Sequence, residues 1–402
     1  MPEFDFTKKT VKILFVIDDL QGHGVTTSLI NLLNAIDVEN LDISLLVLNN
    51  QGSTVEKDIP PKIKHISYDR SIEIFFQTWK KSLWGLLELR RWKLLYYRLK
   101  VYFDTYRYGK VKALQKNWGK IVHSLPCVPG HYDVVIGFQD YFSGVFSLEK
   151  VNAQKYVGWN HNIYQEMGYD DSLTKEYYSK LDLLCTISET TKDSLLRIFG
   201  EKLDSKIMVV PNAINREKID TMSKEQPDDD FFHTDKEKIL SIGRLVEQKG
   251  FDFAIEVGTK LKQDGVSFVW YILGEGTERK NLEKLIDKEK LNDSIVLYGF
   301  TSNPYPFMKS CDVYVQPSRY EGFGIAISEA YYLGSPLIIT PDAGSRYNQS
   351  NTIRIIPYGD ANQWAIAIEE ILRGKKKRKT GQESANDLTV SAFYKIFMSL
   401  MN

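Results

Sequence analysis

The sequence predicts an α/β protein built from two doubly wound, Rossmann-like domains. Its 402 residues are too many for one ordinary hydrophobic core, so the length favours two domains. Short apolar runs alternate with helical patterns in two separate series, which is typical of parallel sheets covered by helices. A polar stretch, residues 216–236, interrupts the alternation and is predicted to be a linker between the domains.

The first series occupies residues 1–215, and a helical pattern follows its first strand behind Gly22 and Gly24. The second series occupies residues 237–380, and an apolar-periodic segment within residues 381–402 predicts a C-terminal helix. Ligands of such folds bind outside the carboxyl ends of the strands, so we expect a cleft there between the two domains. The expected strands are Lys12–Ile17, Ile43–Leu48, Asp133–Gly137, Tyr156–Gly158, Leu183–Ile187, Ile207–Val210, Ile239–Gly243, Phe268–Leu273, Ile295–Tyr298, Val313–Gln316, Leu337–Thr340 and Ile353–Pro357.

Composition and charge narrow the class of protein. The formal net charge is zero, which argues against nucleic acid as a partner. The three cysteines, Cys127, Cys185 and Cys311, lie far apart and indicate neither a zinc site nor a disulfide framework, so a reducing cytoplasm fits best. The apolar run Val11–Ile17 is too short for a signal peptide, and no apolar stretch is long enough to span a bilayer.

The pair Glu321 and Glu329 is the most informative chemical feature of the chain. The two carboxylates flank Gly322, Phe323 and Gly324, between a strand pattern and an apolar helical pattern. If most of this segment is helical, a rise of about 1.5 Å per residue separates the carboxylates by roughly 12 Å, comparable to the span from sugar to ribose in a nucleotide sugar. Free N–H groups at the helix start could then face the phosphates. The alternative is a strand-turn-helix connection with two solvated glutamates.

Basic residues and glycines follow two other strands of the second domain. Arg244 and Lys249 lie on one loop, where a guanidinium can bind a diphosphate in bidentate fashion and an ammonium can act as a point charge. The alternative is that both are ordinary solvated loop residues. Gly243 and Gly274 each end a strand, at turns where αβ units commonly need glycine for backbone geometry.

The first domain offers two further candidates. Gly24 lies where the first strand gives way to a helix, a natural position for the backbone to approach a ligand. Thr27 occupies the place of the third glycine of a dinucleotide fingerprint, which disfavours a nicotinamide dehydrogenase. His161 follows another short strand and could hydrogen-bond a ligand, although a lone histidine is more often structural.

Together these residues resemble glycosyltransferase family 4. The segments that carry the resemblance occur in the family's order and spacing, and the chain looks most like bacterial enzymes that build capsular or exopolysaccharide repeat units. One departure is His23-Gly24, where relatives often have two adjacent glycines. The matching segments are Trp159-Asn160-His161, Val210-Pro211-Asn212, Gly243-Arg244-Leu245, Lys249-Gly250, Gly274-Glu275-Gly276, Gly299-Phe300 and Glu321-Gly322-Phe323-Gly324 with Glu329.

The resemblance implies a GT-B fold and the transfer of a hexosyl-type sugar from a UDP- or GDP-linked donor with retention of anomeric configuration. It implies catalytic roles for Glu321, near the reacting carbon, and for His161, which would contact the sugar from the other domain. Glu329 would bind the ribose, and the helix of residues 381–402 would pack back on the first domain. The remaining implied donor contacts are Arg244, Lys249, Gly24, Gly322, Phe323 and Gly324 at the diphosphate, with Gly243 and Gly274 beside the donor.

Neither a metal nor another cofactor is expected. No Asp-x-Asp pair stands at a strand end near the candidate residues, so Arg244 and Lys249 would stabilise the departing diphosphate in place of a metal. Retention could come from front-face attack, in which the leaving phosphate accepts the acceptor's proton. A covalent route is the alternative.

Residues 71–120 are expected to form an aromatic, basic helical insert in the first domain. Between Trp79 and Lys120, twelve Lys or Arg residues stand against Glu88 and Asp104, a net charge of +10, and four of the seven tryptophans fall in this stretch. Cations and aromatics interleaved at helical spacing are typical of helices in an anionic membrane interface. The alternative is a surface helical hairpin packed on the first domain. Nucleic acid fits less well because no binding motif accompanies the charge.

These observations predict a cytoplasmic enzyme, peripheral on the inner face of the cell membrane, that extends a polyprenyl-linked saccharide. One rival is the same chemistry on a soluble or protein acceptor. A second is a nucleotide-sugar epimerase on a similar scaffold, which acceptor-independent isomerisation would identify. A third is a non-enzymatic sugar-nucleotide binding protein, which slow hydrolysis of the donor would exclude.

Overall fold

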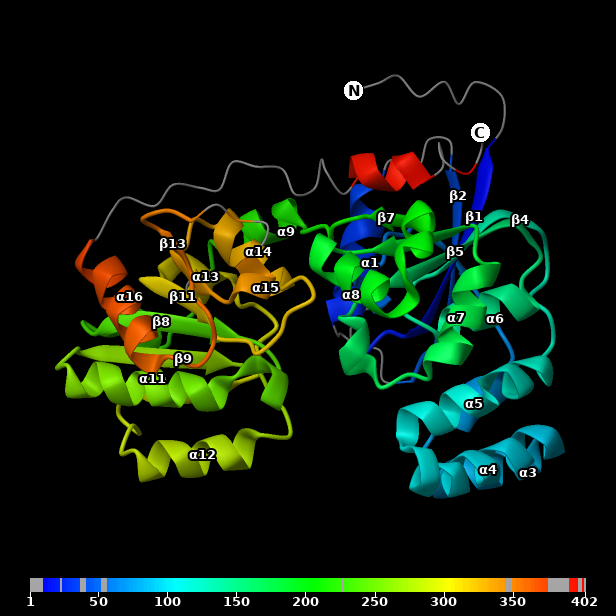
Figure 1. Ribbon diagram of the computed structural model, residues 1–402, viewed down its shortest axis with the longest axis horizontal. Coiled ribbons are helices and arrows are strands. Elements are labelled where there is room, and N and C mark those ends of the chain that lie inside the picture. Colours follow the sequence, from blue (N-terminus) through cyan, green and yellow to red (C-terminus); the bar gives the residue numbers. More distant parts are fainter. Residues whose placement is uncertain are drawn as a thin grey trace. The chain divides into compact units, whose positions relative to one another are not determined.

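The computed structural model describes residues 10–21, 24–36, 41–51, 56–225, 227–344, 347, 349–374, 390–396 and 400. The chain divides into two compact units, the first comprising Met1–Ala213 with Ala385–Asn402 and the second comprising Ile214–Ser384. Each unit is built around one parallel β-sheet with helices packed on it (Figure 1). The predicted fold class, α/β with two doubly wound domains, is therefore confirmed.

The first unit contains seven strands in the order β3-β2-β1-β4-β5-β6-β7, all parallel. The central strand β1 is fully buried from Ile13 to Ile17, as expected where helices cover both faces of a parallel sheet. The strands are β1 (Val11–Asp19), β2 (Leu41–Asn49), β3 (Lys64–Ile66), β4 (Tyr132–Gly137), β5 (Ala153–Asn160), β6 (Leu183–Thr186) and β7 (Ile207–Val209).

Local sequence explains where helix α8 of this unit begins. At the start of α8, the Ser188 hydroxyl accepts the Thr191 N–H while the Thr191 hydroxyl accepts the Ser188 N–H, a capping box. Residues 390–396 are also helical and belong to this unit, where Phe393 stacks on Phe15 with ring centroids 6.1 Å apart. Outside the insert, the helices are α1 (Gly24–Ala35), α6 (Phe142–Lys150), α7 (Asp171–Lys180), α8 (Glu189–Phe199) and the 3-10 turns η1 (Glu56–Asp58), η2 (Tyr164–Met167) and η3 (Glu201–Lys206).

The aromatic, basic insert consists of four consecutive helices. Helix α5 packs on α6, and α3 and α4 form an outer layer beyond α5 (Figure 1). Trp118 of α5 is fully buried and its indole N–H donates to the Phe142 carbonyl at 2.8 Å, whereas Trp84 and Trp92 are 75% and 63% exposed. Among the described residues, no helix is long and apolar enough to cross a membrane. The four helices are α2 (Arg70–Phe76), α3 (Trp79–Glu88), α4 (Trp92–Tyr108) and α5 (Lys110–His123).

The second unit contains six parallel strands in the order β10-β9-β8-β11-β12-β13. Trp270 and Ile272 of β9 join the apolar cluster beneath α11 and α16, while Tyr271 and Leu273 join the cluster on the other face, beneath α13 and α14. The elements are α9 (Arg216–Met222), α10 (Asp230–His233), β8 (Glu237–Ile242), η4 (Glu247–Lys249), α11 (Phe251–Gln263), β9 (Phe268–Leu273), α12 (Arg279–Lys288), β10 (Ile295–Gly299), α13 (Tyr305–Ser310), β11 (Val313–Gln316), α14 (Ile325–Tyr332), β12 (Leu337–Ile339), α15 (Pro341–Gly344), β13 (Ile353–Ile355) and α16 (Ala361–Arg373).

Two features differ from the sequence-based expectation. Residues 216–236, expected as a linker, instead form α9 and α10 and lie in the second unit. The reason is that Ile219 and Phe231 are fully buried in the apolar cluster on one face of the sheet. Strand β3 was not predicted because it has three residues at the sheet edge, and Lys64 and His65 are exposed. Each of the twelve predicted strands is present.

Candidate active site

The carboxyl ends of the central strands bring the predicted residues of the second unit together. Strand β8 lies between β9 and β11, so the strand order reverses there, and doubly wound sheets bind ligands at such a switch point. The loop after β8 carries Arg244 and Lys249, and the loop after β11 carries Glu321. Two loops far apart in sequence therefore supply charged groups to one edge of the sheet.

Two glycines allow these loops to approach one another closely. Gly274 has a φ of +142°, and a Cβ atom there would lie 2.0 Å from the Gly243 carbonyl oxygen. Gly250 has a φ of +64°, and its Cβ atom would lie 2.1 Å from the Pro317 carbonyl oxygen. A side chain at either position would force two backbone segments apart, so both glycines are required by packing as well as by conformation.

Lys249 and Glu321 form an ion pair at this edge. Lys249 Nζ lies 2.5 Å from Glu321 Oε2, and Ser318 Oγ donates to the same oxygen at 3.1 Å. The two side chains are only 16% and 9% exposed. Gln316 Nε2 in turn donates to Ser318 Oγ at 3.2 Å. Lys249 and Ser318 thus fix the position of the Glu321 carboxylate, which the sequence did not indicate.

Arg244 differs from Lys249 in its surroundings. Its side chain is exposed, and among the described residues it makes no ion pair. A guanidinium that no carboxylate engages can form bidentate hydrogen bonds with a phosphate. The prediction that Arg244 binds the donor diphosphate is compatible with this placement.

Arg319 is a structural residue of this edge that sequence reasoning missed. Its guanidinium forms two parallel hydrogen bonds to Asp252, at 2.9 and 2.6 Å, and donates to the Glu247 carbonyl at 2.6 Å. It therefore ties the loop after β11 to the turn that carries Lys249 and to the start of α11. The partners are 67 and 72 residues away in the chain, so no local pattern could reveal them.

The segment between the two glutamates is helical in its second part. Helix α14 begins at Ile325, after Gly324 in the left-handed conformation with a φ of +71°. Glu321, Gly322 and Phe323 lie in the preceding loop, and Phe323 is buried. Five of the nine residues from Glu321 to Glu329 are helical, so the estimate of about 12 Å between the carboxylates, which assumed a mostly helical segment, stays a prediction.

Glu329 is buried on the first turns of α14. Tyr305 O–H donates to Glu329 Oε1 at 3.1 Å. Burial raises the pKa of Glu329 to about 7, while the hydrogen bond from Tyr305 and the charge of Lys218 act in the opposite direction. This carboxyl group is therefore poised between its neutral and ionised forms near neutral pH. Sequence spacing identified Glu329 but gave no indication of Tyr305 as its partner.

His161 follows strand β5 in the first unit and is buried. Its Nε2 lies 2.9 Å from the Phe138 carbonyl oxygen, which can only accept, so Nε2 carries the proton. Nδ1 is buried without a hydrogen-bond partner among the described residues. Burial lowers the pKa of His161 to about 3, and the bond to Phe138 offsets only part of this effect. The imidazole is therefore neutral, with Nδ1 able to accept a hydrogen bond from a ligand hydroxyl.

Asp140 organises the segment around His161, and sequence reasoning missed it. Its carboxylate accepts from His161 N at 2.9 Å, Asn160 Nδ2 at 3.1 Å and Asn162 Nδ2 at 2.9 Å. Burial raises the pKa of Asp140 to about 6, although the hydrogen bonds from His161 and Asn162 lower it. Asp140 follows β4, beside β1 at the reversal of strand order in this sheet, and that position is the signal that could have identified it.

Gly24, the remaining predicted residue of the first unit, begins helix α1. A Cβ atom at Gly24 would meet nothing within 4 Å, so packing does not require glycine there. Gly22 and His23 lie outside the described residues. The proposed contact of Gly24 with the phosphates stays a prediction.

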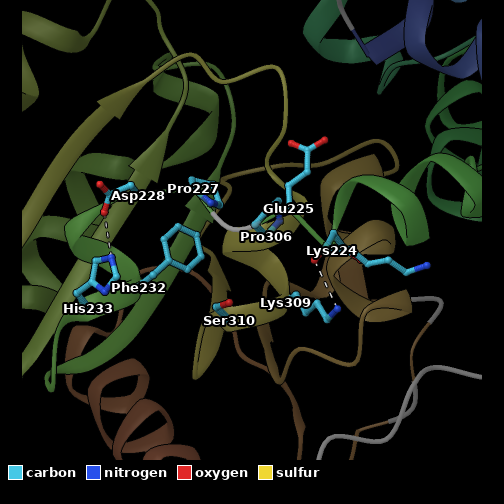
Figure 2. A pocket seen from close by; sticks show the side chains of 10 residues that line it. Lys224, Glu225, Pro227, Asp228, Phe232, His233, Pro306, Lys309 and Ser310 are labelled. Carbon is cyan, nitrogen blue, oxygen red and sulfur yellow. Dashed lines mark hydrogen bonds and ion pairs between the residues drawn. The ribbon is translucent and has the colours of Figure 1, made fainter.

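A separate pocket of about 610 Å³ lies on the second unit and contains none of the predicted residues. Figure 2 shows the hydrogen bond between His233 and Asp228 on one side of Phe232, with Lys309 on the other. His233 precedes β8 and Ser310 precedes β11, so this pocket borders the amino ends of those strands. The predicted residues follow the carboxyl ends, and the pocket is therefore not part of the candidate active site.

Comparison with known proteins identifies related sequences. Residues 222–387 match the family model of glycosyl transferases group 1. The chain is 31% identical over 183 residues to the lipopolysaccharide core biosynthesis glycosyltransferase LpsE of Rhizobium meliloti, covering 45% of this chain and 49% of that protein. It is 28% identical over 211 residues to the N-acetylgalactosamine-N,N'-diacetylbacillosaminyl-diphospho-undecaprenol 4-alpha-N-acetylgalactosaminyltransferase of Campylobacter jejuni, covering 52% and 55%. The chain therefore spans about half the length of these curated relatives.

The fold is similar to that of solved glycosyltransferase structures. The structure of Anabaena HepE in complex with UDP-glucose superposes with a TM-score of 0.65 and 15% sequence identity, covering 97% of this chain and 98% of that chain. At this identity the likeness shows the fold alone. It confirms the predicted GT-B class of two Rossmann-like domains.

Proposed function

We propose that this chain, whose residues 222–387 match the family model of glycosyl transferases group 1, is a retaining glycosyltransferase. It moves a hexosyl-type sugar from a nucleotide-sugar donor to a saccharide acceptor in the synthesis of a bacterial surface polysaccharide. The observation that carries this proposal is the Lys249–Glu321 ion pair at the switch point of the second sheet, inside the residues that match the family. The names of the relatives support the choice of reaction and pathway class.

Charged residues of the second unit bind and stabilise the diphosphate of the donor. Arg244 and Lys249 stabilise the negative charge that develops on the departing diphosphate, because cations fixed by the fold need no reorganisation during the reaction. The N–H groups of Gly322, Phe323 and Gly324 lie beside these phosphates. Gly243 and Gly274 keep the adjoining loops close together.

The two glutamates act at opposite ends of the donor. Glu321 holds the transferred sugar, since its carboxylate is fixed by Lys249 and Ser318. Glu329 accepts hydrogen bonds from the ribose hydroxyls. His161 is a second sugar contact through Nδ1, and Gly24 borders the phosphates. A carboxylate already neutralised by a lysine is a weak nucleophile, which favours front-face attack over a covalent intermediate on Glu321.

The acceptor is a saccharide on a polyprenyl lipid, and the protein is peripheral on the inner face of the cell membrane. The outer helices α3 and α4 support a membrane location. Their side chains Trp84, Phe103 and Tyr106 are 75%, 67% and 77% exposed. The same helices carry the exposed lysines Lys80, Lys81 and Lys93, which make no ion pair among the described residues. The name of the Campylobacter relative includes a diphospho-undecaprenol acceptor. A soluble or protein acceptor is the alternative.

The direct test is donor turnover. The purified protein is incubated with UDP- and GDP-linked hexoses, with and without a polyprenyl-linked saccharide, and nucleoside diphosphate release is measured. We expect slow release without acceptor, faster release with it, and a product whose anomeric proton coupling in NMR matches that of the donor. Release from no donor, together with no thermal shift by UDP or GDP, would refute the proposal. Interconversion of the donor sugar without release would identify an epimerase.

A further inference from the structure

A groove between α4 and α5 contains none of the residues proposed for sugar transfer. Its volume is about 590 Å³, within the range of small-molecule sites. Trp92 and Tyr96 from the first turns of α4 line one side, and Lys120 and His123 from the last turns of α5 line the other. The groove thus combines an aromatic wall with a basic wall.

Gly119 lines this groove from within helix α5, and nothing in the fold requires glycine there. Its φ is not positive, and a Cβ atom would meet nothing within 4 Å. A glycine inside a helix costs about 1 kcal/mol relative to alanine. Gly85 in α3 differs, because a Cβ atom there would lie 2.7 Å from Ile74 Cγ2. The missing side chain at Gly119 leaves open space in the groove.

The charges along the groove favour an anion. Lys93 and Lys120 are exposed and make no ion pair among the described residues, whereas Lys116 nearby on α5 is paired with Asp170 at 2.9 Å. The positive end of α4 and the negative end of α5 both lie at the groove and oppose each other, so the lysines set the sign of the potential. Glu149 of α6 is the acidic residue of the lining, and two lysines outweigh it.

We propose that this groove binds the headgroup of an anionic phospholipid, with the phosphate at Lys93 and Lys120 and the glycerol against Trp92 and Tyr96. Both aromatic side chains are more than half exposed, at 63% and 58%, and such amphipathic rings concentrate at the membrane–water interface. The inference rests on the proposed function, because it names the lipid that holds the enzyme at the membrane. It adds a defined site to the general attraction between a basic surface and anionic lipid.

The test uses paired variants of the full chain. Gly119→Leu fills the groove without changing the charge, and Gly119→Ala is its control because it adds helix propensity but little volume. Lys120→Gln removes a groove cation. Lys112→Gln is its control because Lys112 is an exposed lysine of the same helix that does not line the groove and makes no ion pair with any residue that the structure describes. Thermal unfolding of each variant verifies the fold.

Sedimentation with phosphatidylcholine vesicles, with and without phosphatidylglycerol, measures the lipid affinity. We expect Gly119→Leu and Lys120→Gln to bind phosphatidylglycerol vesicles at least tenfold more weakly than wild type, and both controls to stay within threefold. Wild-type affinity in folded Gly119→Leu overturns the proposal. An equal loss in Lys112→Gln and Lys120→Gln also overturns it, because diffuse surface charge then explains the binding. This second comparison decides the matter if Gly119→Leu does not fold.

Soluble competitors separate a lipid site from a phosphate site. Monomeric dihexanoyl-phosphatidylglycerol should displace the protein from vesicles at concentrations where inorganic phosphate does not. Equal displacement by phosphate overturns the assignment to lipid. Transfer by the wild type in detergent, where no bilayer is present, tests the proposed function by itself, so failure of one proposal is distinguishable from failure of the other.

Discussion

Glu329→Gln should gain stability relative to wild type as the pH rises from 5 to 8, and it should weaken nucleotide binding. Burial raises the pKa of Glu329 to about 7 from an ordinary value of 4.5. The folded protein therefore keeps this carboxyl protonated at pH values where the unfolded chain has already ionised. Because the folded state binds more protons between pH 4.5 and 7, its stability is fully present below this window and falls as the pH rises through it.

The size of the effect follows from the two pKa values. Above pH 7 the gap between 4.5 and about 7 corresponds to a loss of about 3 kcal/mol in the free energy of unfolding. Glutamine has the same shape, carries no charge, and can still accept the hydrogen bond from Tyr305. Its buried amide N–H groups cost about 1–3 kcal/mol if no partner accepts them, at every pH. The pH-dependent part is thus separable from the constant part.

The assay is urea denaturation of wild type and variant from pH 5 to 8. Trp270 and Trp364 are fully buried in the second unit and report its unfolding by fluorescence. Asp18 and Asp140 of the first unit also have raised pKa values, but they are common to both proteins and cancel in the difference. We expect the variant to gain about 2–3 kcal/mol relative to wild type between pH 5 and 8.

A stability difference that does not change with pH would refute the raised pKa of Glu329. The predicted loss of nucleotide affinity does not depend on this change in stability. Loss of a hydrogen bond to a charged group costs about 1.5–3 kcal/mol, so calorimetric titration should show UDP or GDP binding at least tenfold more weakly to Glu329→Gln. Unchanged nucleotide affinity would mean that Glu329 does not bind the ribose.

Three further predictions concern turnover and stability. Arg244→Ala should lower turnover by a factor on the order of 10² and change the free energy of unfolding by less than about 0.5 kcal/mol. Lys249→Met should lower turnover by a similar factor, but it should also cost about 3 kcal/mol of stability because it leaves Glu321 unpaired. Equal urea midpoints for these two variants would contradict the ion-pair argument. Asp140→Asn should lower kcat while leaving the affinity for UDP or GDP unchanged, since it disturbs His161 and not the second unit; an affinity loss in titration calorimetry would count against this role. Turnover should be fully retained in EDTA, and restoration by added Mg²⁺ after a loss would show a metal requirement.

The strands could be predicted because each is a short apolar run whose burial is dictated locally. Sequence-based prediction failed where the role of a residue depends on partners that are distant in the chain. Residues 216–236 are polar on average, yet Phe231 inserts into the second unit and removes the expected linker. Hydropathy averaged along the chain cannot detect one anchoring side chain. Pairing across a sheet also escaped prediction for β3, because an edge strand of three residues has no periodic signal.

The sequence suggested which residues form the candidate site but could not show how they interact with one another. Lys249 and Glu321 were both predicted as ligand contacts, but their ion pair joins residues 72 positions apart. The role of Asp140 was not predicted because its three hydrogen-bond donors lie at the end of a different strand, about twenty residues later. Spacing identifies residues that share a loop or a helix face, and the topology of the sheet decides which loops meet. Supporting residues are therefore harder to predict than the residues they hold.

The sequence also could not show which tryptophans of the insert are exposed, and this matters for the proposed membrane contact. Trp84, Trp92 and Trp118 have similar basic, helical surroundings in sequence, so all were equal candidates for the membrane interface. Helix α5 lies between α4 and α6 and is covered on both sides, which buries Trp118 and lets its indole N–H donate to Phe142. Helices α3 and α4 have no such outer cover among the described residues, and Trp84 and Trp92 stay exposed. Membrane contact should therefore be sought at those two tryptophans, while loss of Trp118 would report on folding and not on lipid binding.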